Sequence, residues 1–156
     1  MKIELTINEN MLDKCALLMS KSEPWLTLNR DLESCKDAMR GDNKEVFIGI
    51  ENSELIGFAV LQIKGTFKGY IQSILIKSSH QGKGFGSTIL KYCEERIFQI
   101  SPNVFICVSS FNAEAERLYL KLDYTKVGDL NNFVVRGHSE TLLRKTIGSL
   151  SEFRPK

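Results

Sequence analysis

The part of the sequence with the most recognisable chemistry is a glycine-rich loop, Gln81-Gly82-Lys83-Gly84-Phe85-Gly86. It follows the branched, apolar run from Tyr70 to Ile76, which is typical of a strand, and precedes a stretch with apolar residues at helical spacing. The first N–H groups of a helix lack partners within it, and the helix dipole places positive potential there. Glycines let the main chain approach an anion without a Cβ clash. The loop therefore predicts a phosphate site, to which Lys83 adds a charge and Ser87 a hydroxyl.

The spacing of these glycines narrows the kind of anion. A P-loop requires Gly-x-x-x-x-Gly-Lys-Ser/Thr, and that pattern is absent. A dinucleotide fingerprint requires Gly-x-Gly-x-x-Gly near the first strand of a βαβ unit, whereas this loop has Gly-x-Gly-x-Gly in mid-chain. A nucleotide-binding domain is therefore disfavoured. Taken alone, the glycines are also compatible with a simple turn between strand and helix.

A second segment, from Asn112 to Tyr124, combines polar and aromatic residues on a predicted helix. Asn112 is suited to cap its N-terminus. Ala115 either leaves room for a ligand or serves as a good helix former. Tyr119 falls on the inner face of the helix, where a tyrosine is usually part of the core and its hydroxyl finds some partner. The helix alone therefore leaves structural and functional roles open.

Together the two segments resemble the acyl-CoA signatures of the GNAT superfamily of N-acetyltransferases. The first combines the strand Ile74-Leu75-Ile76 with Gln81-x-x-Gly84-x-Gly86, and the second is Asn112-x-x-Ala115-x-x-Leu118-Tyr119-x-Lys121. The resemblance implies acetyl-CoA as cosubstrate and Tyr119 as the general acid that protonates the departing CoA thiolate. It places the cofactor-binding residues at Ile74, Leu75, Ile76, Gln81, Gly82, Lys83, Gly84, Phe85, Gly86, Ser87, Asn112 and Ala115.

Two positions depart from the family pattern. Asp123 stands where the family usually has glycine at a helix C-terminus, and aspartate adopts the left-handed conformation expected there at modest cost. Many family members carry a glutamate base on the central strand, near Tyr70 or Gln72 here, and neither is a carboxylate. Glu23, Glu140, His138 and a water chain stay open as the proton acceptor.

By the same resemblance, the acceptor groove lies between the first two helices and the final hairpin. Trp25 and Leu26 either line it or pack the helices onto the sheet, and Phe133 in the hairpin has the same two readings. Glu23 and Asp31 favour a cationic amine in this groove.

The predicted elements follow the order βαα-βββ-αβ-αββ. Hydrophobic periodicity predicts strands over 2–7, 46–51, 55–64, 70–76, 103–109, 125–135 and 140–147. It predicts helices that begin after Asn8 or Asn10, and over about 28–40, 84–99 and 112–122. This order indicates one mixed α/β domain over 1–148, which the resemblance implies is an acetyltransferase domain, and a frayed C-terminal tail over 149–156. The resemblance implies a GNAT-like acyl-CoA N-acyltransferase fold, an α+β arrangement with a central, mostly antiparallel sheet flanked by helices.

Composition limits the partners. The chain of 156 residues has 42% hydrophobic and 26% charged residues and a net charge of +2, which gives no clustered basic footprint for nucleic acid. No apolar run approaches the length that spans a bilayer, and the first residues lack a signal-peptide core. The four cysteines show no Cys-x-x-Cys pair, and Cys15, Cys93 and Cys107 lie among apolar residues as core positions. We therefore expect a cytoplasmic protein without metal, nucleic acid or membrane partners, and leave a homodimer open.

The sequence thus predicts direct transfer of an acetyl group from acetyl-CoA to a primary amine in a ternary complex. A strand N–H near Ile74 is expected to stabilise the oxyanion. The acceptor can be a small molecule or a protein, at an N-terminal or lysine amine. A non-catalytic acyl-CoA-binding module is the alternative: the missing strand carboxylate keeps it open, and Tyr119 argues against it.

Overall fold

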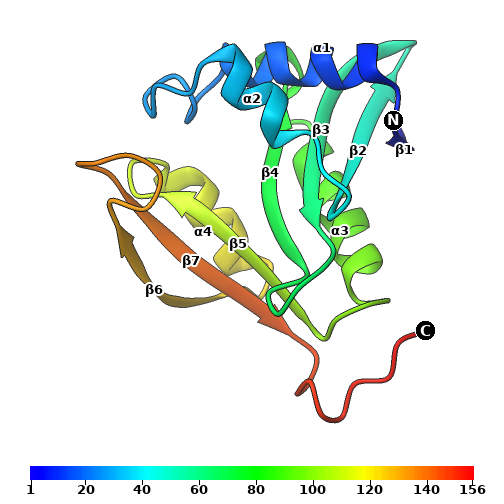
Figure 1. Cartoon of the computed structure of the whole chain (residues 1–156), viewed down its shortest axis with the longest axis vertical. Coiled ribbons are helices and arrows are strands. Elements are labelled where there is room, and N and C mark those ends of the chain that lie inside the picture. The colour runs from blue at the N-terminus through cyan, green and yellow to red at the C-terminus, as the bar shows by residue number, and fades with distance from the viewer.

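One seven-stranded sheet runs through the molecule (Figure 1). The computed structural model describes all residues from Met1 to Lys156. Every neighbouring pair of strands is antiparallel except β4 and β5, which are parallel. The prediction of a mixed, mostly antiparallel sheet is confirmed. In spatial order the strands are β1 (Lys2–Thr6), β2 (Lys44–Glu51), β3 (Glu54–Gln62), β4 (Tyr70–Ile76), β5 (Asn103–Ser109), β7 (Ser139–Thr146) and β6 (Thr125–Asn131).

Helices cover both faces of the sheet. The first helical pair packs over one face with a core that includes Phe58, Val60 and Leu75. The later helices pack over the other face, where Ala59, Leu61 and other residues form the larger core. This alternation along β3 follows from the two-residue period of a strand. The helices are α1 (Glu9–Ser20), α2 (Leu32–Ala38), α3 (Phe85–Ile97) and α4 (Ala113–Lys121), with a short 3₁₀ turn at Ser78–His80.

Capping side chains decide where the first two helices begin. The Asn8 side chain accepts a hydrogen bond from the Met11 N–H at 3.0 Å, which confirms one of the two predicted caps. The helix predicted over about 28–40 is too long, because Asp31 accepts the Ser34 N–H at 2.8 Å and α2 begins only at Leu32. Residues 21–29 form turns instead, in which Leu28 is buried.

The central feature of the sheet is a gap between its two parallel strands. β4 and β5 pair only at Tyr70–Phe105 and Ile71–Ile106, and then diverge toward α2 (Figure 1). Where β3 pairs with β4, Val60 lies opposite Ser73 and Leu61 lies opposite Ile71. Gln72 is therefore an extra residue in β4. Such a bulge bends a strand and re-aims a side chain. The divergence leaves the edge of β4 beyond Ile71 without a partner strand.

The last part of the chain differs slightly from the prediction. β6 ends at Asn131 rather than near 135, and the residues up to His138 form the turn to β7. After Gly148 the chain makes a turn, in which the N–H groups of Glu152 and Phe153 donate to the Ser149 carbonyl, where a frayed tail is predicted. None of the helices has the length and apolar character that crossing a membrane requires.

Candidate active site

The glycine loop leaves a row of main-chain donors free. Gly82 and Gly84 have φ of 75° and 84°, in the left-handed region that glycine adopts without strain. Gly84 is the N-cap of α3 and no side chain caps this end. The six consecutive N–H groups from Gly82 to Ser87 donate no hydrogen bond within the protein. A Cβ at Gly82 or Gly84 would meet nothing within 4 Å, so the space beside the loop is open. These donors and the helix dipole fit a phosphate or pyrophosphate group.

A cleft of about 950 Å³ extends from this loop along β4 to α4, and we call it the long cleft. Gln81 holds the start of the loop against β4, since its Nε2 donates to the Ile76 carbonyl at 2.9 Å. The unpaired edge of β4 beyond Ile71 offers main-chain groups to an extended chain, as in strand addition. The residues predicted from sequence that line this cleft are Ile74, Leu75, Ile76, Gln81, Gly82, Gly84, Gly86, Ser87, Asn112, Ala115 and Tyr119.

Two of the predicted loop residues do not line the long cleft. Lys83 is exposed. Phe85 is partly buried against the larger core, with its ring centroid 6.0 Å from that of His80. Other lining residues were not predicted as binding residues, including Phe111, Arg117 and Lys121, although Lys121 belongs to the second motif. Arg117 and Lys121 are four residues apart on α4, and their shared helix face was readable from the sequence.

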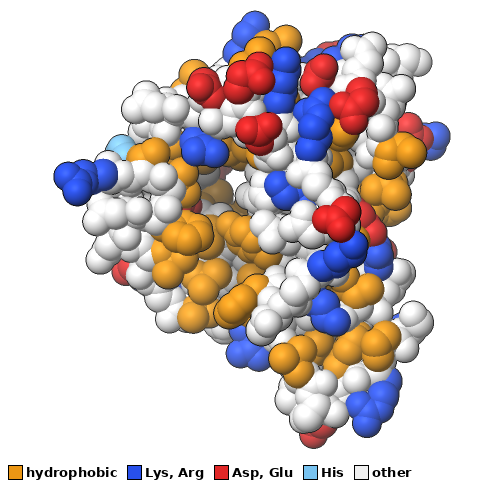
Figure 2. Space-filling model, in the orientation of Figure 1, with side chains coloured by type: hydrophobic (Ala, Val, Ile, Leu, Met, Phe, Trp, Pro, Cys, Tyr) orange, Lys and Arg blue, Asp and Glu red, His pale blue; other side chains and the backbone are white.

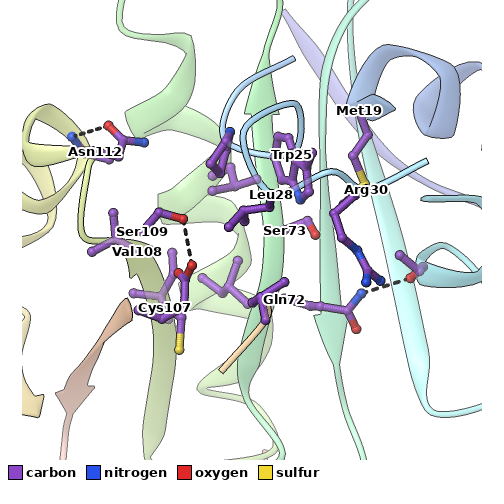
Figure 3. A pocket seen from close by; sticks show the side chains of 18 of the residues that line it. Met19, Trp25, Leu28, Arg30, Gln72, Ser73, Cys107, Val108, Ser109 and Asn112 are labelled. Carbon is purple, nitrogen blue, oxygen red and sulfur yellow. Dashed lines mark hydrogen bonds between the residues drawn. The ribbon is translucent and has the colours of Figure 1, made fainter. Parts of the chain in front are cut away.

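A second hollow, the central cavity, has a volume of about 420 Å³. In Figure 2 the molecule is hollowed between the α1–α2 region and the β6–β7 hairpin, and hydrophobic side chains gather beside the opening. Figure 3 shows its lining: Trp25 and Leu28 come from the turns after α1, Gln72 and Ser73 from β4, and further side chains from β5. The lining residues with polar side-chain groups are Arg30, Ser34, Cys35, Gln62, Tyr70, Gln72, Ser73, Cys107, Ser109, Asn112, Tyr119 and Glu140.

The two hollows meet at one place. The residues that line both are Pro24, Ile74, Asn112, Ala115 and Tyr119. The Asn112 side chain accepts the Ala115 N–H at 3.3 Å, which confirms it as the N-cap of α4, and its own N–H donates to the Ser109 carbonyl at 2.8 Å. A ligand along the long cleft and one in the central cavity can therefore touch at this junction.

Tyr119 presents an unused hydroxyl at the junction. Tyr119 is only 7% exposed, and the centroid of its ring lies 5.8 Å from that of Tyr124. The Tyr119 hydroxyl makes no hydrogen bond within the protein, yet it is not among the enclosed atoms without partners, which are Glu94 Oε1 and Tyr124 Oη. Burial raises the pKa of Tyr119 to about 12. The phenol thus keeps its proton over the neutral range and can donate it.

Glu140 places a carboxylate in the wall of the central cavity. It lies on β7 opposite Ser109 of β5, is 5% exposed, and accepts the Ser109 hydroxyl at 2.7 Å (Figure 3). Burial raises the pKa of Glu140, against opposing effects of Ser109 and His138. A carboxylate with a raised pKa in a cavity is suited to accept a proton.

The other candidate bases and acceptor residues lie differently. Glu23 lines the long cleft, and its Oε2 accepts the Thr27 N–H at 3.2 Å. His138 lies outside both linings, with its ring 5.5 Å from that of Phe111. Asp31, expected to favour a cationic amine, caps α2 and does not line the cavity.

Further predictions concern the wall of the central cavity. Trp25 and Phe133 line the central cavity, whereas Leu26 is exposed outside it. Cys107, expected in the core, is only partly buried and lines the cavity. Cys15, Cys35 and Cys93 are buried as free thiols. No three His, Cys, Asp or Glu side chains gather closely enough to hold a metal ion.

The structure thus combines a mixed sheet that opens between two parallel strands with an uncapped helix N-terminus at the long cleft. Residues 11–124 match the family model described as "Acetyltransferase (GNAT) family", and the chain therefore belongs to that family. The family consists of acyltransferases. Comparison with curated proteins gave no match.

Solved structures of several acetyltransferases share the fold. The Escherichia coli ribosomal-protein-S18-alanine N-acetyltransferase superposes with a TM-score of 0.75 at 15% identity, over 99% of each chain. The aminoglycoside 6′-N-acetyltransferase from Enterococcus faecium gives 0.73 at 18% identity, over the whole of both chains. A Salmonella typhimurium protein solved with acetyl-CoA as its cofactor gives 0.73 at 16% identity, over 96% of this chain and 95% of that one. At these identities the similarity establishes the fold and leaves the acceptor to be argued from this chain's own cavity.

Proposed function

We propose that the protein transfers the acetyl group of acetyl-CoA to a primary amine while both are bound. The observation that carries this proposal is the junction, where the long cleft and the central cavity share Asn112 and Tyr119. A protein of the same fold has been solved with acetyl-CoA, which supports acetyl-CoA as the occupant of the long cleft. The amine then enters from the central cavity.

The chain's residues would hold acetyl-CoA in three ways. The free N–H groups from Gly82 to Ser87 bind the pyrophosphate. The open edge of β4 at Ile74–Ile76 pairs with the pantetheine arm. An N–H of β4 near Ile74 lies at the junction and stabilises the charge that develops on the thioester oxygen. Lys83 and Phe85, expected from the sequence to take part, act indirectly, through local charge and through packing of the loop.

Two side chains move the protons. Bound acetyl-CoA supplies an activated acetyl group, so that a bond from the amine nitrogen to the acetyl carbon replaces the carbon–sulfur bond. Glu140 first takes a proton from the acceptor's ammonium group, which frees the nitrogen lone pair. Tyr119 gives its proton to the sulfur and is restored by the second proton that the nitrogen loses. The proton on Glu140 then passes to solvent, which balances the reaction.

An acceptor screen tests this function. Purified protein is mixed with acetyl-CoA and a panel of amines, and thiol release is followed with formation of the N-acetyl product. Tyr119→Phe is expected to lower kcat by about 10²- to 10⁴-fold, the range of general acid catalysis. Tyr92→Phe is the matched control. Tyr92 is on α3, where its ring packs against that of Phe47, and it lines neither hollow.

The outcomes separate the two functional readings. Thiol release that depends on an amine, and that Tyr119→Phe but not Tyr92→Phe suppresses, supports the enzyme. Tight binding of acetyl-CoA without release by any amine supports the non-catalytic acyl-CoA-binding module instead. Unchanged turnover in Tyr119→Phe would show that the acid role is wrong.

A further inference from the structure

The central cavity has a simple charge pattern. Among its lining residues only Arg30 and Glu140 bear charged side chains, and their charges are opposite. Tyr70, Cys107 and Tyr119 also line it, but burial raises the pKa of each, so they stay neutral at neutral pH. A charged group on an acceptor in the central cavity is therefore attracted or repelled by these two side chains.

Arg30 has a free guanidinium. Its main chain is fixed, because its N–H donates to the Trp25 carbonyl at 3.0 Å. The guanidinium makes no hydrogen bond or ion pair within the protein, and the neighbouring Asp31 is occupied by capping α2. Figure 3 shows the Arg30 side chain reaching toward Gln72 on the β4 side of the cavity.

Gln72 makes no hydrogen bond to this guanidinium. Its Nε2 donates to the Ala38 carbonyl at 3.1 Å, and its Oε1 accepts from Gln62 Nε2 at 3.1 Å. Arg30 thus directs five unused donors and a positive charge at the cavity. A planar fork of this kind matches a carboxylate in a two-point contact.

Glu140 lies on the opposite side of the central cavity from Arg30, on β7 next to β5. Its Oε1 accepts the Ser109 hydroxyl, and no cation lies within ion-pair distance of either oxygen. Oε2 has no partner in the protein and is not among the enclosed unpartnered atoms, so it opens to the cavity. Ser109 also contacts Asn112 through its carbonyl, which places the Glu140 side of the cavity next to the junction.

We propose that the acceptor is a small amine that also carries a carboxylate, of the amino-acid type. Its ammonium group lies toward Glu140 and the junction, and its carboxylate binds Arg30 across the cavity. This inference rests on the proposed acetyl transfer and names its substrate class. A cavity of about 420 Å³ suits a molecule of this size.

Matched pairs of acceptors test the proposal. Amino acids are compared with their carboxamides, which keep the amine and side chain and lose the anionic group. The protein is expected to favour the acids over the amides by about tenfold to a hundredfold in kcat/KM, as for a charge-assisted two-point contact. Arg30→Met keeps an apolar stem and should bring this ratio close to one. Arg154→Met, in the exposed C-terminal turn, makes the same change elsewhere and should keep the ratio.

A binding measurement makes the test independent of turnover. N-acetyl amino acids and their carboxamides are titrated calorimetrically into the protein with CoA present. Tighter binding of the acids that disappears in Arg30→Met supports the proposal. Equal binding of both, or a preference that survives in Arg30→Met, overturns it. Acetylation of amides as fast as acids likewise refutes the carboxylate site while leaving acetyl transfer intact. Absence of thiol release with every amine refutes the transfer itself.

Discussion

Replacing Gly84 by alanine separates two roles of the glycine loop. Gly84 has φ of 84°, where a side chain is strained, and an added Cβ would meet no protein atom within 4 Å. The cost to folding is therefore only the left-handed backbone penalty, about 1–2 kcal/mol. For a chain of this length this corresponds to a melting temperature lower by roughly 2–8 °C.

The effect on CoA binding should be larger than this backbone cost explains. The methyl group would stand in the open space where the phosphate approaches the free N–H groups. Loss of one charge-assisted hydrogen bond, about 1.5–3 kcal/mol, weakens binding about tenfold to a hundredfold. Gly137→Ala is the matched control: Gly137 has φ of 91°, also has no atom within 4 Å of an added Cβ, and lines neither hollow.

Calorimetric titration with CoA and thermal unfolding are measured for the unchanged protein, Gly84→Ala and Gly137→Ala. Both variants should lose similar stability, and only Gly84→Ala should lose affinity for CoA. Unchanged affinity in Gly84→Ala would refute the phosphate site at this loop. An equal loss of affinity in both variants would show that the effect follows from stability alone.

Three other predictions concern the framework. Asn112→Ala removes the cap of α4 and should lower the free energy of unfolding by about 0.5–2 kcal/mol in urea titrations. Gly69→Ala would force a Cβ against the backbone carbonyl of Asn103, the first residue of β5, and should lower the free energy of unfolding by about 3 kcal/mol or more. Gly65→Ala, at φ of 89° with open space around an added Cβ, should lower it by only about 1–2 kcal/mol. Burial raises the pKa of Cys15 and Cys93 to about 12, while unfolded thiols ionise near pH 8.5. Since the unfolded state then binds fewer protons, stability should fall above about pH 8.5 by up to roughly 1.4 kcal/mol per pH unit per thiol, with a shallower slope when both are alanine.

Local patterns predicted much of the fold. The strand at 103–109 has the predicted bounds, because a continuous apolar run between Pro102 and a polar segment leaves little choice. Asn112 caps its helix as predicted, and Asp123 adopts the left-handed conformation with φ of 69°. These features depend on hydrogen bonds within a few residues, which the sequence displays directly.

Features that depend on distant segments were not predictable. The start of α2 was misplaced because Leu28, an apolar residue at helical spacing, is buried by turns rather than by a helix. The bulge at Gln72 depends on the register with β3. The opposition of Arg30 and Glu140 joins the turn before α2 to the last strand, and no sequence pattern links two such charges.

The position of bound CoA tests the central claim, that the two hollows meet where acetyl transfer occurs. A crystal structure with CoA should place the pyrophosphate within hydrogen-bond distance of the N–H groups from Gly82 to Ser87, about 3 Å. The pantetheine arm should lie along β4, with the sulfur near the Tyr119 hydroxyl at the mouth of the central cavity. A pyrophosphate bound elsewhere, or a sulfur directed away from Tyr119, would contradict it.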